Sequence, residues 1–464
     1  MYSIKFGTDG WRAIIAKEFT VENVKRVSQG VSNWLLKNYT NPSVVIGHDC
    51  RFAGKLFLEE SAKVFISNGI QVYYQKGFVS TPMISMGTLH LKASIGVVIT
   101  ASHNPPEYNG YKLKGSFGGP LLPHDIEEIE KLIPDTEPLV DVDLTNHSLF
   151  IEKNLEELYI NAVRNSFDLD AIHQSDLRFG YDAMYGSGQS IMNTLFPEIE
   201  LLHCNVNPGF EGIAPEPILR NLKEFEEFIK ISESIDCGLV TDGDADRIGL
   251  FDGNGKFVDS HHIILLLIHY LVKYKGMKGK VITAFSVSEK VKKLCAHYQL
   301  EQLTTQIGFK HITGYMISED VLLGGEESGG IAVKGHIPER DGIWMGLIIW
   351  EFMAKSGKSL TELIQEVYDI VGEFAYDRLD LHLTNEQKDK VVTACRENRF
   401  SSFGNYKVLK TENIDGFKYH FENEVWLLIR ASGTEPVLRI YAETRSSEET
   451  KSFLQIVKQT VLEC

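Results

Sequence analysis

No stretch of this sequence is apolar for long enough to cross a membrane. The most apolar stretches, Ile263 to Ile268 and Ile343 to Trp350, are far shorter than the roughly 20 residues that a membrane-spanning helix needs. The first residues also lack the apolar core of a signal peptide. We therefore expect a cytoplasmic protein that does not enter a membrane.

The sequence has few cysteines, and no two of them stand at metal-binding spacing. None of the six forms a C-x-x-C motif, and they are spread along the whole chain. Widely spaced cysteines of this kind are typical of reduced thiols. The sequence thus predicts neither a disulfide framework nor a zinc site. The six are Cys50, Cys204, Cys237, Cys295, Cys395 and Cys464.

Basic side chains are outnumbered, with 47 lysines and arginines against 63 acidic residues and a net charge of −16. Such a chain is a poor partner for nucleic acid or for an anionic membrane surface, so we expect neither. An anionic small molecule remains possible as a substrate if a locally basic pocket binds it. The sequence also lacks a G-x-S-x-G elbow, a P-loop and a complete G-x-G-x-x-G motif.

At 464 residues the chain is too long for one hydrophobic core, and its pattern predicts four blocks. Strands alternate with helices in the first three blocks, which predicts α/β domains with parallel strands and covered sheet faces. The last block reads as a smaller α+β domain. An acidic, irregular stretch from Leu139 to Asn154 indicates the first boundary. The predicted blocks are residues 1–150, 151–258, 259–372 and 373–464.

The first candidate site is the sequence T-A-S-H-N-P at residues 100–105, which follows the apolar run Ile95 to Ile99. The run predicts a buried strand, and the Asn-Pro pair predicts a turn that ends it. Ser102 is therefore expected at the exposed end of a strand, with His103 beside it. Most serines in such positions only cap or turn the chain. Lys112 follows shortly after and either folds back over the serine or is a solvated surface lysine.

The second candidate site holds three aspartates, Asp242, Asp244 and Asp246, directly after another apolar run. Carboxylates at alternate positions of a tight turn can converge on one hard cation. A calcium EF-hand begins similarly, but here Arg247 stands at the sixth position, where glycine is needed, and Gly253 at the twelfth, where glutamate belongs. The pattern therefore favours a metal-binding loop between strands. An acidic turn without a metal is the alternative.

The third candidate site is the glycine-rich loop 324–330, which contains Glu326 and Ser328. Carboxylates accept hydrogen bonds from neighbouring hydroxyls, so this loop suits the binding of a sugar. Acidic glycine loops are common, however, and the motif is weak by itself. Lys310 opens a predicted helix after Gly308, a position that favours an anion.

The fourth candidate site is the loop that contains Arg430, Ser432, Gly433 and Thr434. An arginine beside hydroxyls and backbone amides makes a concave set of donors that can bind phosphate. Arg12, between the first glycines and the first helix, either binds a phosphate through its planar fork or belongs to an ordinary surface turn.

These four loops, in this order and spacing, resemble those of the α-D-phosphohexomutases, the family of phosphoglucomutases and phosphomannomutases. The resemblance covers essentially the whole chain. It implies three similar α/β domains with mixed sheets and a smaller C-terminal α+β domain around a central cleft. It further implies that Ser102 is a phosphoserine. Asp242, Asp244 and Asp246 would then hold one Mg²⁺ together with an oxygen of Ser102.

The resemblance assigns roles to the remaining motif residues as well. Glu326 and Ser328 would bind sugar hydroxyls. The non-reacting phosphate would be held by Arg430, Ser432, Gly433 and Thr434. Supporting cations and proton-transfer groups would be Arg12, His103, Lys112, Arg247 and Lys310.

The implied reaction converts hexose 1-phosphate and hexose 6-phosphate into each other through a hexose 1,6-bisphosphate, which would also act as activator. Many phosphomannomutase-type members carry a histidine where Gly330 stands, and His336 or Arg340 could replace it here. We expect glucose as the preferred sugar, with mannose and glucosamine as alternatives. A phosphatase, a sugar-bisphosphate synthase and a non-catalytic sugar-phosphate sensor are the competing functions. The protein is expected to be a monomer or a homodimer.

Overall fold

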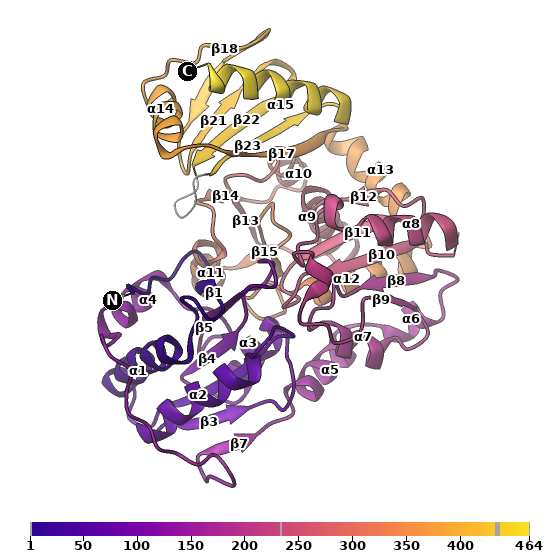
Figure 1. Cartoon of the computed structure of the whole chain (residues 1–464). Coiled ribbons are helices and arrows are strands. Elements are labelled where there is room, and N and C mark those ends of the chain that lie inside the picture. Colours follow the sequence, from indigo (N-terminus) through magenta and orange to yellow (C-terminus); the bar gives the residue numbers. More distant parts are fainter. Residues whose placement is uncertain (1, 233, 432–436, 464) are drawn as a thin grey trace. The chain divides into compact units, whose positions relative to one another are not determined.

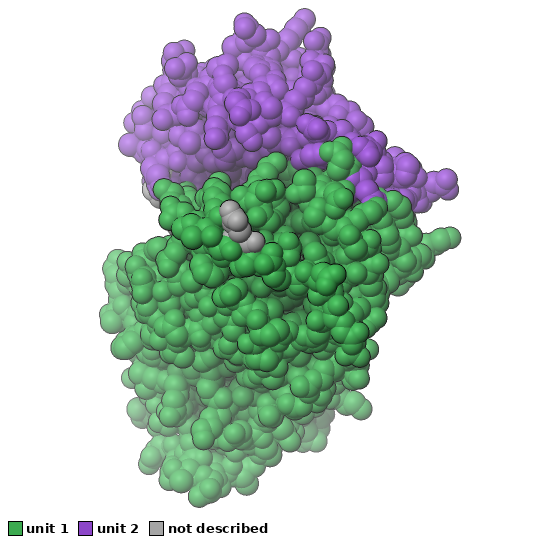
Figure 2. Space-filling model, turned by 90° about the vertical axis from the view of Figure 1, so that its right-hand side faces the viewer, with its two compact units in different colours: residues 1–282, 308–365 green, residues 283–307, 366–464 purple. Residues whose placement is uncertain are grey.

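The computed structural model describes residues 2–232, 234–431 and 437–463. The chain divides into two compact units (Figure 2). Unit 1 contains residues 1–282 and 308–365, and unit 2 contains residues 283–307 and 366–464. The block predicted over residues 259–372 is therefore shared between the two units, and the four-block division stays a prediction. Within the described ranges no helix is both long and apolar enough to span a membrane.

The first sheet of unit 1 has the strand order β1-β5-β4-β2-β3-β7, with β6 paired to β5 (Figure 1). Strand β2 runs parallel to β3 and β4, as the alternation of strands and helices predicts. Its strands are β1 (Trp11–Ile14), β2 (Ser43–His48), β3 (Gln71–Tyr74), β4 (Ile95–Ile99), β5 (Tyr108–Gly115), β6 (Gly119–Pro120) and β7 (Phe150–Glu152).

This mixed sheet agrees with the fold that the resemblance implies, but two of its features differ from what the alternation of strands and helices alone predicts. Strand β5 runs antiparallel to both β4 and β1, because the connection over residues 100–107 is too short for the crossover that parallel strands require. The irregular stretch predicted as a boundary also contributes β7, which pairs in parallel with β3. The sheet is therefore mixed, and the antiparallel β4–β5 pair holds the T-A-S-H-N-P loop between its strands.

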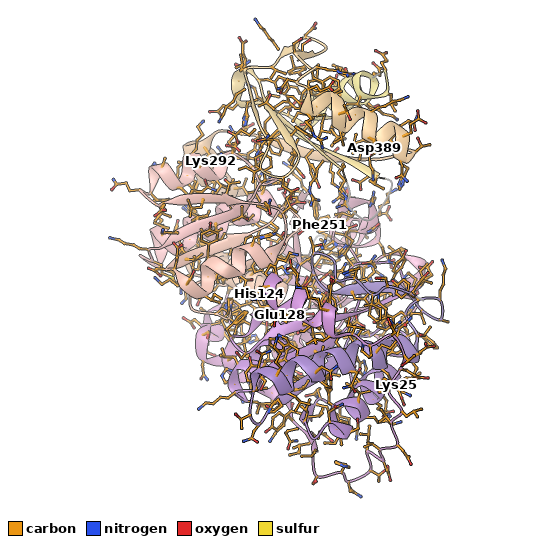
Figure 3. The ribbon with its side chains drawn as sticks, turned by 90° about the vertical axis from the view of Figure 1, so that its left-hand side faces the viewer. Lys25, His124, Glu128, Phe251, Lys292 and Asp389 are labelled. Atoms are coloured by element: carbon orange, nitrogen blue, oxygen red, sulfur yellow. The ribbon has the colours of Figure 1, made fainter. Side chains whose placement is uncertain are left out.

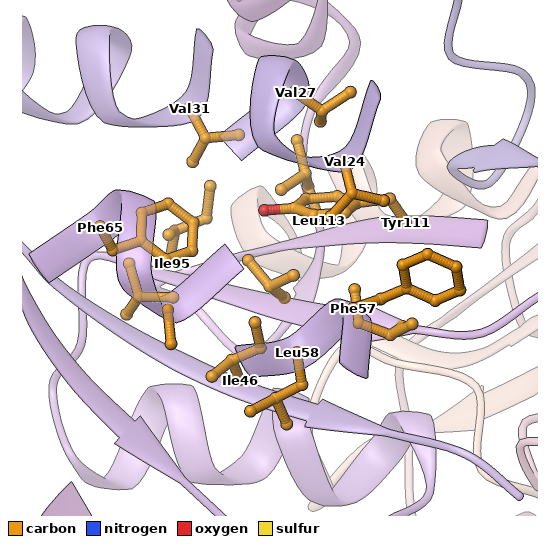
Figure 4. Close-up of a cluster of buried hydrophobic side chains, with 14 of the residues drawn as sticks. Val24, Val27, Val31, Ile46, Phe57, Leu58, Phe65, Ile95, Tyr111 and Leu113 are labelled. Atoms are coloured by element: carbon orange, nitrogen blue, oxygen red, sulfur yellow. The ribbon is translucent and has the colours of Figure 1, made fainter. Parts of the chain in front are cut away.

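Both faces of the first sheet are covered by helices. Helix α1 begins after Thr20, whose side chain accepts a hydrogen bond from the Asn23 amide, and its apolar side chains Val24 and Val27 pack toward Tyr111 of β5 (Figure 4). On the opposite face lies α3, since a Cβ added at Gly96 of β4 would lie 2.4 Å from a Thr88 oxygen. Each fully buried aliphatic side chain here contributes about 1.5–3 kcal/mol.

The second sheet of unit 1 has the order β12-β11-β10-β8-β9. Strand β10 is parallel to β8 and antiparallel to β11, so the three aspartates lie in the tight turn of a β10–β11 hairpin. Phe251 of β11, which is labelled in Figure 3, belongs to an apolar cluster with Phe225 and Ile229 of α8. The strands are β8 (Phe179–Asp182), β9 (Glu200–Leu202), β10 (Cys237–Thr241), β11 (Ile248–Asp252) and β12 (Phe257–Val258).

A second hairpin of unit 1 carries the sugar-loop candidate. Strands β15 (Val321–Gly325) and β16 (Ile331–Val333) are antiparallel, and residues 326–330 connect them. The helices that lie within unit 1 are α1 (Val21–Asn38), α2 (Gly54–Ser67), α3 (Thr81–His90), α4 (Pro123–Leu132), α5 (Leu155–Ser166), α6 (Leu169–His173), α7 (Gln189–Leu195), α8 (Lys223–Ser232), α9 (Ser260–His269), α11 (Phe309–Ser318) and α12 (Gly342–Ser356).

Unit 2 is built on the antiparallel sheet β17-β23-β22-β21-β20. Phe285, from the part of the chain that precedes α10, packs in an apolar cluster with Trp426, Leu428 and Tyr441 of this sheet. The elements of the sheet and its helices are β17 (Ala375–His382), β20 (Lys410–Glu412), β21 (Phe417–His420), β22 (Trp426–Ala431), β23 (Val437–Thr444), α10 (Lys290–His297), α14 (Asn385–Arg396) and α15 (Ser447–Leu462).

The cysteine prediction agrees with this fold. In the described ranges no two cysteines form a disulfide. Burial raises the pKa of the Cys50 thiol well above its usual value, and it raises that of Cys237 to about 12. These thiols therefore stay protonated and act as small buried apolar groups.

Candidate functional site

Ser102 lies in the loop between β4 and β5, but it is buried, with a relative exposure of 1%. The sequence prediction of an exposed serine is wrong because the aspartate hairpin packs on this loop. A Cβ added at Gly243 would lie 2.6 Å from the Ser102 carbonyl oxygen, so the two backbones are in direct contact. Ser102 also has a φ of 53°, a left-handed conformation that residues with a Cβ rarely adopt.

The hydroxyl of Ser102 faces a carboxylate and an imidazole. Its Oγ donates a hydrogen bond to Oδ2 of Asp242 at 2.7 Å and lies 3.3 Å from Nδ1 of His103. Burial, followed by the positive charges of Arg247 and Arg12, holds the pKa of His103 well below its usual value. His103 is therefore neutral near pH 7 and can accept a proton.

Asp242, Asp244 and Asp246 form a buried cluster in which one oxygen from each carboxylate lies within 4.8 Å of the others. One oxygen of Asp244 and one of Asp246, Oδ1 in each case, have no hydrogen-bond partner in the described part of the chain. Burial and the two neighbouring carboxylates raise the pKa of Asp242 well above its usual value. Buried, unpaired carboxylate oxygens at this spacing fit a hard divalent cation.

Lys112 lies on β5 and points into the same cluster, which excludes the interpretation of a solvated lysine. Its Nζ is 2.7 Å from Asp244, 2.9 Å from Asp246 and 2.8 Å from Asp9. Burial lowers the pKa of this ammonium, but the three carboxylates outweigh burial and raise it. Lys112 therefore carries a positive charge beside the Ser102 loop.

Arg340 connects the aspartate cluster to the sugar-loop candidate. Its guanidinium lies 2.7 Å from Asp246, 2.5 Å from Asp9 and 3.9 Å from Glu326. Glu326 accepts a hydrogen bond from the Gly308 amide at 2.9 Å, and burial raises the pKa of Glu326 to about 7 although Arg340 opposes the shift. Of the two residues considered as replacements for a histidine at position 330, Arg340 lies in this site.

His336, the other residue considered, has a different environment. Its Nε2 lies 2.9 Å from Asp341, and its ring stacks on Trp344 at a centroid distance of 3.7 Å. These contacts hold the start of α12 in place, so His336 acts as a packing residue.

Gly330 lies so close to the Arg340 side chain that no larger residue fits there without moving Arg340. A Cβ added at Gly330 would lie 2.4 Å from Cδ of Arg340, so any side chain there must displace the arginine. We expect Gly330→Ala to lower the free energy of unfolding by about 1–3 kcal/mol, as overpacking does. We also expect it to lower kcat/KM about tenfold, through loss of the Arg340 contacts. Thermal denaturation and steady-state kinetics measure the two effects.

The matched control is Gly314→Ala in α11, where an added Cβ meets nothing within 4 Å. Alanine is the better helix former by about 1 kcal/mol, so this variant should be slightly stabilised and fully active. If Gly330→Ala behaved like Gly314→Ala, the fit between Gly330 and Arg340 would be of no consequence.

Backbone contacts join the candidate loops of unit 1. Arg247 forms a β-bridge with Gly330, and the Ile248 amide donates to the Gly329 carbonyl at 3.1 Å. The Gly342 amide donates to the Ala245 carbonyl at 3.0 Å. The aspartate hairpin is thereby held between the Ser102 loop and the glycine-rich loop.

Of the other predicted residues of unit 1, Arg12 contacts the Ser102 loop, and the Arg247 amide donates to Asp242 at 3.1 Å. The Arg12 guanidinium donates to the Asn104 side chain at 2.7 Å, so Arg12 reaches the Ser102 loop. Arg247 lies 3.8 Å from Glu216. Lys310 and Ser328 are half-buried at the start of α11 and in the glycine-rich loop.

The fourth candidate loop belongs to unit 2. Arg430 donates a hydrogen bond through Nε to Asp415 at 3.0 Å. Ser432, Gly433 and Thr434 lie outside the described residues. Their role in phosphate binding stays a prediction.

Several residues that no sequence motif singled out also lie at this site. Asp9 contacts Lys112 and Arg340, and Thr81 donates to Asp244 through its hydroxyl at 2.5 Å. Asp49 and Arg51 support the Ser102 loop. The sequence does contain a signal for Asp49 and Arg51, because they directly follow β2. Polar groups at the carboxyl ends of parallel strands lie together at one edge of the sheet, which is also where Ser102 lies.

Comparisons with known proteins agree with this geometry. Four domain models of the phosphoglucomutase/phosphomannomutase family match the chain: domain I over residues 3–139, domain II over 157–255, domain III over 259–371 and the C-terminal domain over 383–459. A phosphoglucomutase/phosphomannomutase of Thermococcus kodakarensis is 30% identical over 97% of both chains. A phosphoglucosamine/phosphogalactosamine mutase of Sulfurisphaera tokodaii is 29% identical over 98% of both.

A solved structure from Thermus thermophilus, described as a candidate phosphomannomutase, superposes with a TM-score of 0.88 at 32% identity over 99% of both chains. A buried serine beside a carboxylate cluster and several cationic side chains fits a phosphoryl-transfer enzyme, in which positioning and charge stabilisation do most of the work. Within that class, the chain belongs to the phosphoglucomutase/phosphomannomutase family, the α-D-phosphohexomutases. It is an enzyme of the intramolecular phosphotransferase type, an isomerase, and the predicted α/β fold class is confirmed.

Proposed function

We propose that this protein interconverts hexose 1-phosphate and hexose 6-phosphate through a phosphorylated Ser102. The observation that carries the proposal is the 2.7 Å hydrogen bond from the Ser102 hydroxyl to Asp242 of the three-carboxylate cluster. A serine at this position can hold a phosphoryl group next to a divalent cation. The function of the family supports the same reaction class.

In the proposed reaction, a hydroxyl oxygen of the sugar phosphate attacks the phosphorus on Ser102. The bond from phosphorus to Ser102 Oγ breaks as the bond to the sugar oxygen forms, and the hydroxyl proton passes to a base. His103 lies 3.3 Å from Ser102 Oγ, the leaving oxygen, so it is suited to take the Ser102 hydroxyl proton when the second phosphate returns to the serine. The product is a hexose 1,6-bisphosphate. The bisphosphate then reverses its orientation in the site, and its other phosphate is transferred back to Ser102.

Charge neutralisation is the main task of the protein in such a transfer. Lys112 and Arg340 bring positive charge to the site, and Arg12 and Arg247 lie beside it. Asp242, Asp244 and Asp246 would hold one Mg²⁺, which supplies Lewis-acid polarisation of the phosphoryl group when bound. The buried side chains of Lys112 and Arg340 would neutralise the negative charge of the phosphoryl group that the metal ion leaves uncompensated.

We infer that Glu326 and Ser328 bind the sugar hydroxyls, with Lys310 at the nearby helix start. The non-reacting phosphate would be bound by Arg430, Ser432, Gly433 and Thr434. This site must bind phosphate without contacting the sugar ring specifically, because it has to accept the phosphate at either end of the bisphosphate. Free hexose 1,6-bisphosphate would act as activator by restoring the phosphate on Ser102.

Glucose is the sugar that we propose, because the loop carries the Glu-Glu-Ser sequence and lacks a histidine at position 330. Phosphoglucosamine mutase activity is the second candidate. It is favoured by relatives of that name, such as the Finegoldia magna protein, 28% identical over 96% of this chain.

The test is a coupled assay with Mg²⁺ and a trace of the matching bisphosphate. Glucose, mannose and glucosamine 1-phosphates are compared side by side, and glucose 1-phosphate is expected to have the highest kcat/KM. A higher value for glucosamine 1-phosphate would reassign the sugar but keep the mechanism. Release of phosphate to water without isomerisation would identify a phosphatase. Net accumulation of bisphosphate would identify a synthase, and binding without turnover a sensor.

A further inference from the structure

The side chain of Arg51 donates hydrogen bonds to several backbone carbonyl groups of the loop that carries Ser102. It follows β2, the neighbour of β4 in the first sheet, and its side chain has no exposed surface. Its four terminal N–H groups are all used on this loop. They donate to the carbonyl oxygens of Ser102 at 2.7 Å, Asn104 at 2.5 Å, Pro105 at 2.8 Å and Tyr108 at 3.0 Å.

Asp49 fixes the orientation of this guanidinium. One of its oxygens lies 3.3 Å from Nε of Arg51, and the other accepts the Arg51 amide at 2.9 Å. The Phe210 ring lies against the guanidinium at 5.0 Å. Arg51 therefore has a single orientation, with its planar fork directed at the loop.

Asp49 also reaches Ser102 by a second route. It accepts the hydroxyl hydrogen of Thr100 at 2.5 Å, and Thr100 Oγ1 in turn accepts the amide hydrogen of Ser102 at 2.9 Å. The carbonyl of Ser102 is thus held through Arg51, and its amide is held through Thr100. Both routes meet at Asp49.

Ser102 needs such support because its backbone conformation is unfavourable. Its φ of 53° is rare for a residue with a Cβ, and such conformations persist only where surrounding contacts fix them. Four carbonyl dipoles that point at one place also repel each other unless a cation lies between them. Without the Arg51 guanidinium the loop would relax to a more favourable backbone conformation, and the hydrogen bond from Ser102 Oγ to Asp242 would be lost.

We propose that Arg51 is a positioning residue for the Ser102 nucleophile. Asp49 holds Arg51 in its orientation, and Thr100 fixes the Ser102 amide as a second support. The inference rests on the proposed function for its kinetic consequence. Its structural consequence, an ordered loop over residues 100–108, does not depend on that function. The contacts of the Arg51 guanidinium with this loop are all to backbone carbonyls, so Arg51 acts through the position of Ser102.

A simple stabilising role is the competing explanation, and the chain offers a matched control for it. Arg26 of α1 is also buried, and its guanidinium also binds backbone carbonyls, those of Pro134 at 2.9 Å and Tyr2 at 3.3 Å. These carbonyls lie away from the Ser102 loop. Arg26→Lys therefore loses comparable contacts without affecting the nucleophile.

The experiment compares Arg51→Lys with Arg26→Lys in the full-length protein. Lysine keeps the charge but has three donors and no planar fork. For Arg51→Lys we expect kcat to fall about 100-fold with KM for the sugar phosphate unchanged, as misplacement of a reacting group does. We also expect faster amide hydrogen exchange over residues 101–108. Arg26→Lys should leave both kcat and the exchange of this loop as in the wild type.

The outcomes separate this inference from the proposed function. Wild-type exchange over residues 101–108 in Arg51→Lys, or an equal loss of kcat in Arg26→Lys, overturns the positioning role. If the wild type isomerises no sugar phosphate, the proposed function fails, and the exchange comparison still decides the role of Arg51. If Arg51→Lys does not fold, Thr100→Val replaces it. That variant should show the same signature, and Thr100→Ser should restore wild-type behaviour.

Discussion

Replacing Ser102 by alanine is expected to lower the rate of hexose phosphate isomerisation by about 10⁴-fold or more, because it removes the covalent route. The fold should be kept, since the loop is held through its backbone by groups that the substitution leaves in place. The rate is measured in the coupled assay. A second measurement follows labelled phosphate from a sugar bisphosphate, which should stay on the wild-type protein and be absent from the variant.

The matched control is Ser61→Ala in α2. Ser61 is also fully buried in unit 1, and its hydroxyl donates to the Phe57 carbonyl of its own helix at 2.8 Å and neighbours the Tyr111 hydroxyl. That variant should keep its activity and its phosphate label. Full activity of Ser102→Ala, or a label retained by it, would show that phosphate transfer uses another group.

Removal of the divalent cation is expected to have the second large effect. Chelation by EDTA should lower turnover by at least about 100-fold, and Mg²⁺ should restore it, because the cation supplies several kcal/mol of charge stabilisation. Mg²⁺ at about 100 times its Kd should also stabilise the folded protein by about 2.7 kcal/mol. This shift in thermal denaturation is independent of activity. It would be absent if Lys112 alone neutralised the carboxylates.

Asp244→Asn tests the same cluster from the side of the protein. It changes a proposed metal ligand with an unpaired buried oxygen and removes one of the charges that hold Lys112. We expect turnover to fall about 100-fold or more and the Mg²⁺ concentration for half-maximal activity to rise. Asp236→Asn is the control, since the Asp236 carboxylate binds the amide and the guanidinium of Arg178, directly before β8. Equal Mg²⁺ dependence in both variants would place the metal elsewhere.

The sequence predicted the outline of the fold because strands and glycine loops are local features. The apolar runs before Ser102 and before Asp242 are the observed strands β4 and β10. Helix α1 begins at Val21, directly after Thr20, and the Thr20 hydroxyl is a local capping signal of the same kind. The spacing of three aspartates was enough to indicate a tight turn between strands, and the β10–β11 hairpin is that turn.

The arrangement of charges in the site could not be predicted in the same way, because it depends on contacts between distant parts of the chain. Lys112 meets Asp244 only because β5 turns back along β4 and the aspartate hairpin packs against it. The burial of Ser102 has the same cause. Arg340 is separated from Asp9 by most of unit 1 in sequence, and no local pattern links the two.

The division of the chain into units has a consequence for how such proteins can diversify. Phe285 and Ile307 lie in the segment 283–307, yet they pack against Trp426 and Leu428 of the C-terminal sheet. Lys418 likewise binds Glu289 at 2.7 Å. A C-terminal domain exchanged between relatives by recombination would therefore carry an apolar face without its partner. We therefore expect changes in the apolar face of this sheet to be matched by changes in the segment 283–307.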